Sequence, residues 1–178
     1  YNIERSFFNT SVALPYLTPG YFITPKISFR GNNYRSESTN LLSSRNESFT
    51  VPTFSLDSGL YFERDATELQ SLFGRAYIMT LEPRAFYVYT PYRDQSTIPL
   101  LDTAPFGMGI YQIFSENTFV GNDRVADNNK VTAGVTSRII DGETGVERLR
   151  MTMAQRVDLG PQQVGLNGNL IPANSQPI

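Results

Sequence analysis

The residues able to carry out covalent chemistry are scarce in this sequence. Among its 178 residues there is no cysteine and no histidine, so the chain lacks a thiol nucleophile, a disulfide and the commonest general base. Paired carboxylates remain, and Glu82 with Glu63 or Glu147 on a neighbouring strand has the residue types that glycoside hydrolysis requires. Opposite charges on a strand face normally compensate each other, which favours an ion pair between Glu82 and a nearby arginine. We therefore expect that this protein is not an enzyme.

Two further motifs suggest ligands but fail on spacing. The segment Gly107-Met108-Gly109 begins like a dinucleotide-binding loop, yet Gln112 occupies the position of the third glycine. The run 122–129 is rich in carboxylate and amide oxygens, but its spacing differs from that of a calcium-binding EF-hand and is typical of a turn. We expect neither a cofactor nor a metal ion.

The composition argues against a nucleic-acid partner and against a membrane-spanning helix. Lysine and arginine number 15 against 17 aspartate and glutamate residues, and the net charge of -2 gives no basic field for binding nucleic acid. No apolar stretch approaches the ~20 residues of a membrane-spanning helix. The sequence begins at Tyr1 without a recognisable targeting segment, and we interpret it as an excerpt of a longer protein.

Apolar and polar residues alternate with a period of two, which predicts β-strands rather than helices. The expected strands are 4–14, 21–30, 51–63, 75–90, 130–140 and 146–157. The last two form a hairpin around 141–145, where Gly142 and Gly145 supply the backbone conformations of a tight turn. The sequence therefore predicts an all-β, antiparallel fold of about six strands.

The connections between these strands alternate in length. Those at 15–20 and 141–145 are short, whereas those near 31–48 and 92–128 are long. Short turns at one end and long loops at the other are typical of outer-membrane β-barrels, whose strands need ~9–11 residues to cross the bilayer. A soluble β-sandwich, which could bind carbohydrate on its tyrosines, shows the same alternation because one face of each sheet meets water. Both architectures remain open on these grounds.

Three prolines lie inside the expected strands: Pro25, Pro52 and Pro83. Each removes a backbone donor from the hydrogen-bond ladder. They count against regular central pairing in either architecture.

Two long segments resemble a known family. The run TLEPRAFYVYTPYRDQS, residues 80–96, is similar to the best-known signature of the LptD family, the lipopolysaccharide-assembly proteins once called organic solvent tolerance proteins. The run GNDRVADNNKVTAGVTSR, residues 121–138, resembles the family's next strand entry, and residues 147–150 resemble its returning strand. These matches follow one another at the family's spacing.

The resemblance implies a specific architecture and role. LptD proteins are large outer-membrane β-barrels of Gram-negative bacteria, joined to a periplasmic jelly-roll domain and plugged by the lipoprotein LptE. They are translocons that insert lipopolysaccharide into the outer leaflet during outer-membrane assembly. The expected partners are an LptE-like lipoprotein plug, lipopolysaccharide, outer-membrane lipid and, through the N-terminal domain absent here, periplasmic bridge proteins. Residues 1–178 would form part of the transmembrane β-barrel.

Alternation within a barrel assigns each strand face either to lipid or to the lumen. The side chains expected to face lipid are Tyr77, Met79, Leu81, Leu149, Met151 and Met153. The side chains expected to line the lumen or to contact the plug are Glu82, Arg84, Arg93, Asp94, Asp123, Arg124, Arg138, Arg148 and Arg150.

The long connection between the expected strands 75–90 and 130–140 carries five aromatic residues: Tyr92, Phe106, Tyr111, Phe114 and Phe119. Loops beyond ~12–15 residues are usually functional or disordered, and so many aromatic residues argue against disorder. We expect this loop to fold inward over the lumen, where it would meet the plug. Hydrogen bonds at its base would involve Arg93, Asp94, Asp123 and Arg124.

Overall fold

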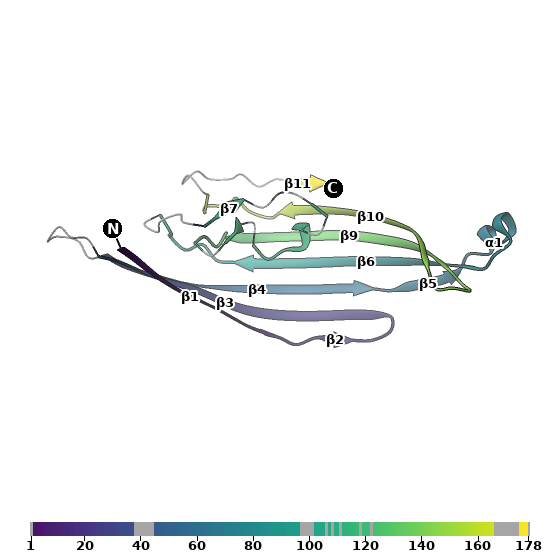
Figure 1. Ribbon diagram of the computed structural model, residues 1–178, viewed down its shortest axis with the longest axis horizontal. Coiled ribbons are helices and arrows are strands. Elements are labelled where there is room, and N and C mark those ends of the chain that lie inside the picture. The colour runs from purple at the N-terminus through teal and green to yellow at the C-terminus, as the bar shows by residue number, and fades with distance from the viewer. Residues whose placement is uncertain are drawn as a thin grey trace.

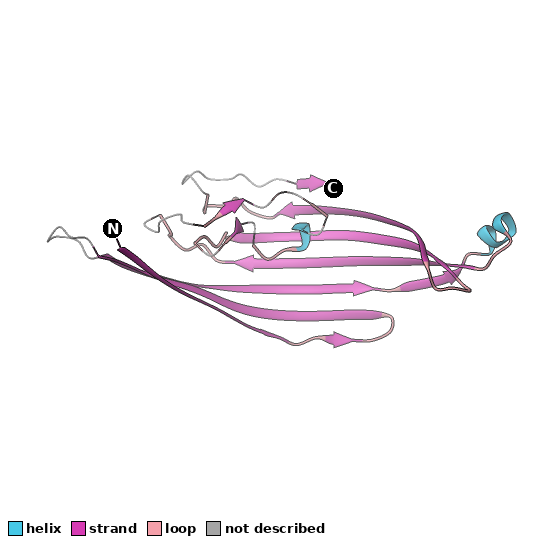
Figure 2. Ribbon diagram, viewed as in Figure 1, coloured by secondary structure: helices cyan, strands magenta, loops and turns pink. Residues whose placement is uncertain are grey.

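The chain forms one long antiparallel sheet (Figure 1; Figure 2). The computed structural model describes residues 2–37, 45–96, 102–105, 107, 109–110, 112–117, 119–121, 123–165 and 175–177. The strand order is β1-β3-β4-β6-β9-β10-β11, with β2 paired to β3 and β5 paired to β6. The strands of this sheet are β1 (Asn2–Ala13), β2 (Tyr16–Leu17), β3 (Tyr21–Glu37), β4 (Arg45–Leu60), β5 (Phe62–Asp65), β6 (Tyr77–Thr90), β9 (Asn128–Asp141), β10 (Glu147–Asp158) and β11 (Ser175–Pro177). The all-β, antiparallel prediction is confirmed.

Two strands run farther than the sequence predicts. The connection expected at 31–48 is largely strand, because β3 continues to Glu37 and β4 begins at Arg45. Tyr34 pairs with Glu47 in this extension, and residues 38–44 lie outside the described part of the chain. The extension was missed because its residues are mostly polar on both faces, so no apolar alternation marks it.

The three strand prolines lie where a neighbouring ladder is interrupted. Pro25 faces the break between β1 and β2, since Ala13 pairs with Lys26 and Tyr16 pairs with Ile23. Pro83 faces the equivalent break between β4 and β5, and Pro52 lies beyond the point at which β4 begins to pair with β6. The sheet therefore keeps its regular register although each proline lacks a donor.

The two faces of the sheet differ in an unusual way. We call the side that carries Leu81 and Met153 the apolar face, and the side that carries Glu82 and Arg138 the polar face. Large apolar side chains on the apolar face are exposed, and Met153 reaches 69%. Other exposed members of this face are Ile23, Ile27, Phe29, Phe54, Leu60, Phe62, Leu149, Met151 and Val157. Within the described residues, no second large sheet covers this face, as a β-sandwich would require.

Buried apolar side chains lie instead on the polar face, beneath residues 91–127, which we call the covering loop. This loop contains β7 (Ala104–Pro105) paired with β8 (Phe119–Val120), and the 3-10 turn η1 (Gln112–Phe114). Phe86 and Val88 project from β6 toward it, and Ile113 from η1 is fully buried. The small core is thus enclosed between the polar face and its loop.

The connection between β5 and β6 forms a short helix, α1 (Thr67–Phe73), which the sequence analysis did not predict. Seven residues are too few for a 3.6-residue period to stand out from chance. Among the described residues, no helix has the length and hydropathy needed to cross a membrane.

Candidate functional site

A ladder of alternating charges runs across the polar face. The guanidinium of Arg138 on β9 donates to Glu82 on β6 at 2.6 Å and lies 3.8 Å from Glu147 at the start of β10. Arg150 donates twice to Glu147, at 2.9 and 2.8 Å. Arg138 and Arg150 are directly opposite each other in the register, so the two carboxylates offset a repulsion between like charges.

This arrangement suits a structural role better than catalysis. A glycosidase needs two carboxylates facing one substrate bond, but Arg138 bridges Glu82 and Glu147. All three side chains are partly exposed, so the ladder borders solvent. The expected ion pairing of Glu82 is therefore present, with Arg138 as its partner.

Arg84 links two strands to the covering loop. Its guanidinium donates to both carboxylate oxygens of Asp57 on β4, at 2.9 and 2.7 Å. The same group lies 4.4 Å from the ring centre of Phe114, a distance at which a cation is attracted to an aromatic face. This arginine therefore joins strands β4 and β6 to the turn η1.

The ring of Phe114 fits over a glycine in β9. A β-carbon at Gly134 would lie only 2.9 Å from this ring, so a larger residue would displace it. Phe86 packs edge-on against the same ring, with 6.4 Å between ring centres. Next to it, the hydroxyl of Thr132 donates to the carbonyl of Ile113 at 2.9 Å. The turn η1 is thus anchored to the sheet by packing and by a hydrogen bond.

Two polar residues that follow η1, Glu116 and Asn117, form further hydrogen bonds in this part of the loop. Glu116 accepts a hydrogen bond from Ser55 at 2.7 Å and lies 3.1 Å from the ammonium of Lys26. Asn117 donates to the carbonyls of Phe119 and Arg124, so it stabilises the loop internally. Between this part of the loop and strands β3, β4 and β6 lies a hollow of about 540 Å³, lined by both polar and apolar side chains.

Asp123 connects one stem of the loop to strands β1 and β3, at one edge of the sheet. Its buried carboxylate accepts hydrogen bonds from Arg5 on β1 at 2.8 Å, from Tyr34 on β3 at 2.5 Å and from the backbone of Asp102 at 2.6 Å. Arg5 also forms an ion pair with Asp102 at 3.0 Å. Because Asp123 has protein partners, it is not arranged as a calcium ligand; Asn122 lies outside the described residues.

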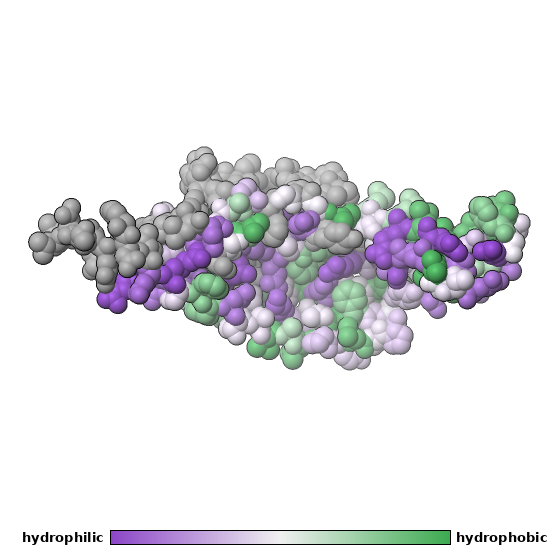
Figure 3. All heavy atoms as spheres, viewed as in Figure 1, coloured by the Kyte–Doolittle hydropathy of each residue, from purple (hydrophilic) through white to green (hydrophobic). Residues whose placement is uncertain are grey.

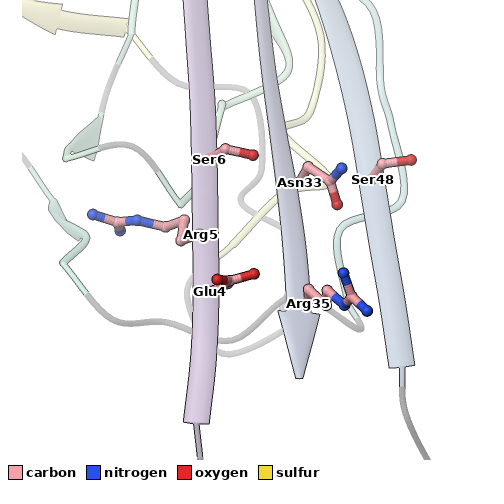
Figure 4. Close-up of a pocket in the computed structure, with 6 residues that line it drawn as sticks. All are labelled: Glu4, Arg5, Ser6, Asn33, Arg35 and Ser48. Atoms are coloured by element: carbon pink, nitrogen blue, oxygen red, sulfur yellow. The ribbon is translucent and has the colours of Figure 1, made fainter. Parts of the chain in front are cut away.

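Figure 4 shows why Arg5 can reach the loop. Glu4 and Ser6 point to one side of β1, together with Asn33, Arg35 and Ser48 of the neighbouring strands, whereas Arg5 points to the other side. The five side chains line a second polar hollow of about 540 Å³, to which Arg5 also contributes. Strand alternation thus sends Arg5 to the loop side.

The two stems of the covering loop are joined by Gln95. Its side-chain amide donates to the carbonyl of Val125 at 2.8 Å and accepts from the amide of the same residue at 3.0 Å. Arg124 donates to the carbonyl of Gln95, and burial lowers the pKa of this arginine. Asp94 accepts from the amide of Ser96 at 2.9 Å, which lowers the pKa of Asp94.

The residues predicted to line the lumen or contact the plug lie in three places: the charge ladder with Arg84, the base of the covering loop and, for Arg148, the hairpin turn. The structure brings Glu82, Arg138 and Arg150 together and connects Arg84 to the loop. Asp94, Asp123 and Arg124 form hydrogen bonds at the loop base as expected. Within the described residues, the contact of Arg93 is made by its carbonyl, 3.4 Å from the Gln95 amide.

Arg148 lies apart from the charge ladder. A bulge between Glu147 and Leu149 shifts the register, and Arg148 donates instead to Asp141 in the hairpin turn at 2.9 Å. Phe106 and Tyr111 lie outside the described residues.

The family model of LptD, described as LPS transport system D, matches residues 1–177. Proteins described as LPS-assembly protein LptD are 53% identical over 94% of this chain in Cupriavidus pinatubonensis and 53% identical over 93% in Ralstonia nicotianae. A relative of the same description in Aromatoleum aromaticum is 52% identical over 88% of the chain. The matched region covers 21%, 21% and 19% of these relatives, so the chain spans about a fifth of their length.

Proposed function

This chain belongs to the LptD family, and from that premise we propose that its sheet is part of an outer-membrane β-barrel that delivers lipopolysaccharide to the outer leaflet. The chain spans about a fifth of its relatives, so the remaining strands would come from the rest of the parent protein. Delivery would be a transport step without covalent chemistry.

The observation that carries this proposal is the distribution of apolar side chains. Folding in water buries large apolar residues, yet here they are exposed along the apolar face of the sheet. Charged residues lie instead on the polar face, which the covering loop partly encloses. Hydrocarbon in contact with the apolar face would resolve this contradiction. The six side chains proposed to face lipid do lie on that face: Tyr77, Met79, Leu81, Leu149, Met151 and Met153.

Strand length and pairing agree with a membrane location. The long strands have 12 to 17 residues, more than the ~9–11 that span a bilayer when tilted. In hydrocarbon every backbone polar group must be paired, which only a closed sheet achieves with strands. The outer edges of β1 and β11 would therefore pair with further strands of the parent.

The polar face would border the lumen. The charged side chains on this face would keep the lumen wall hydrated; they are Glu82, Arg84, Arg138 and Arg150. The hollow beneath the covering loop is lined by positively and negatively charged side chains, which an LptE-like plug could contact. In this orientation the covering loop is extracellular and the turn at 141–145 is periplasmic. Bridge proteins would engage a part of the parent outside this chain.

Two neighbouring residues of β3 provide a test. Ile23 lies on the apolar face in register with Ser58 and, through it, with Ala85, whereas Thr24 lines the hollow on the polar face opposite Asp57. Ile23→Arg should destabilise the barrel, by up to about 2–4 kcal/mol, which is the cost that arginine on the lipid face reaches at the bilayer midplane. Thr24→Arg should assemble normally, because its charge can meet Asp57.

Assembly is measured as the heat-modifiable folded band of the full-length protein in outer-membrane fractions. Loss of this band for Ile23→Arg alone is the expected result. Equal assembly of the two variants, or a larger loss for Thr24→Arg, would refute the assignment of the faces.

A further inference from the structure

The helix α1 lies at the end of the sheet remote from the covering loop (Figure 1). Leu69, Leu72 and Phe73 are spaced three and four residues apart, so they share one side of the helix. Gly74 ends the helix with a φ of 69°, and its amide donates to the carbonyl of Gln70 at 2.8 Å. None of the seven helical residues is buried.

The apolar side of α1 is unusually open. Leu72 is 74% exposed, the highest value among the exposed large apolar side chains in the described part of the chain, and Phe73 is 66% exposed. Figure 3 shows this end of the molecule as an apolar surface beside hydrophilic atoms. Scattered single apolar residues are common on protein surfaces, but adjacent ones on one helix side indicate a contact.

The helix continues the apolar face of the sheet. The ring of Phe73 packs edge-on against Tyr77, with 6.2 Å between ring centres and an interplanar angle of 79°. Tyr77 is the first residue of β6 and lies on the apolar face, in register with Asp141. The apolar side chains of β6 on this face are therefore continued by the contact of Tyr77 with Phe73.

Two arginines, Arg64 and Arg75, lie near this junction. Arg64 pairs with Met79, which places it on the apolar face, and its guanidinium nitrogen lies 3.8 Å from the Met79 sulfur. Another nitrogen of the same group lies 3.8 Å from Glu68 on α1. Arg75, between the helix and β6, is also exposed. Arginines in such positions keep their stems on apolar surface and their charges at the level of lipid headgroups.

We propose that α1 lies in the headgroup layer of the inner leaflet, with Leu72 and Phe73 inserted among the upper acyl carbons. The inference rests on the proposed function, because only a bilayer against the apolar face would place headgroups at Tyr77. A partner protein suits this surface poorly, since three apolar residues fall far short of the ~1,200 Å² that a stable protein interface buries. Amphipathic helices bind membrane interfaces in this manner.

Site-directed spin labelling of the full-length protein tests the position of α1. Nitroxide labels are attached at Leu72→Cys, at Gln70→Cys on the polar side of the same helix, and at Leu81→Cys on the apolar face of β6. The protein is reconstituted in vesicles of phosphatidylethanolamine and phosphatidylglycerol. Collisions with oxygen, which enters the bilayer, are compared with collisions with a water-soluble nickel chelate.

The expected ratio of oxygen to nickel collisions is severalfold higher at position 72 than at position 70, and highest at position 81. Equal ratios at 70 and 72 with a high ratio at 81 would overturn the inference and leave the proposed function intact. A label at 72 shielded from both reagents would also overturn it, because protein would then cover the helix. A low ratio at 81 would instead contradict the proposed membrane face.

Discussion

At the scale of single residues, Gln95 acts as a substitute for a strand partner. Its side-chain amide forms two hydrogen bonds with the backbone of Val125, as one residue does with another in a β-ladder. Both residues are buried, so water cannot replace these bonds. The covering loop is therefore closed at its base by a side chain.

Gln95→Ala should loosen the loop without unfolding the sheet. The change leaves the buried amide and carbonyl of Val125 without these partners, at a cost of about 1–3 kcal/mol for each group. Limited proteolysis of the folded full-length protein, followed by mass spectrometry, should then show faster cleavage within 97–118. Arg93→Gln, at an exposed neighbouring position whose described contact is made by the backbone carbonyl, should cleave at the rate of the unmodified protein. Equal rates for both variants would show that Gln95 does not close the loop.

Part of this base was visible in the sequence. The sequence predicts Asp123 and Arg124 at this base, and both make hydrogen bonds there. Arg5 was not expected, because its hydrogen bond to Asp123 joins residues 118 positions apart. Gln95 lies within the family motif at 80–96, and that motif alone does not indicate its contact with Val125. Periodicity shows which face a residue occupies, but it does not show which distant segment folds onto that face.

At the scale of elements, the turn between β9 and β10 is stabilised by one carboxylate in addition to its backbone hydrogen bonds. Asp141 accepts hydrogen bonds from the amides of Glu143 and Thr144, each at 3.1 Å, and from Arg148 at 2.9 Å. The hydrogen bond from Arg148 is the main cause that lowers the pKa of Asp141 to about 2, and the amide of Thr144 adds to it. The turn thus depends on the ionised form of this side chain.

The turn should weaken in acid. Because the folded pKa of Asp141 lies below its ordinary value of 3.8, its contribution is fully present above about pH 4 and is lost as the pH falls toward 2. Asp141→Asn should unfold at a lower temperature than the unmodified protein at pH 5, and this difference should shrink between pH 4 and pH 2. The measurement is the temperature at which the folded band disappears on a gel. Glu143→Gln, at an exposed turn position, should show no such trend, and a pH-independent deficit for Asp141→Asn would contradict the account.

The strands themselves were largely predictable, and the exceptions have physical reasons. Alternation located β6 and β9 to within about two residues, because half-buried strands carry the period most clearly. The polar end of β3 and the short helix α1 carry no such period. The prolines indicated irregular pairing, but only the three-dimensional register shows that each falls at the interruption of one ladder.

At the scale of the whole molecule, the sheet reverses the usual arrangement of a water-soluble protein. Its core lies under a loop on the polar face, and its larger apolar surface is open. As an isolated sheet it would also expose strand edges that favour aggregation. Both features are consistent with a segment that completes a larger barrel in the proposed membrane setting.

The covering loop then becomes the boundary between the proposed lumen and its plug. Deleting residues 97–118 removes Ile113, Phe114 and Glu116, and so uncovers Phe86 and Val88 on the polar face. A plug that rests on this loop should lose part of its contact surface. We therefore expect less LptE-like lipoprotein to co-purify with the deletion variant of the full-length protein, and the cells should admit a large dye that intact outer membranes exclude.

A second variant separates the contacts from the length of the loop. Replacing residues 97–118 by a glycine-serine linker of equal length keeps the stems at Gln95 and Asp123 but removes the anchoring side chains. If η1 positions the loop for the plug, the linker variant should lose co-purification as the deletion does, because a flexible chain cannot hold a surface against the wall. Normal co-purification of both variants would show that the plug binds elsewhere on the parent. Loss in the deletion alone would show that loop length, and not the anchor at Arg84 and Gly134, determines the contact.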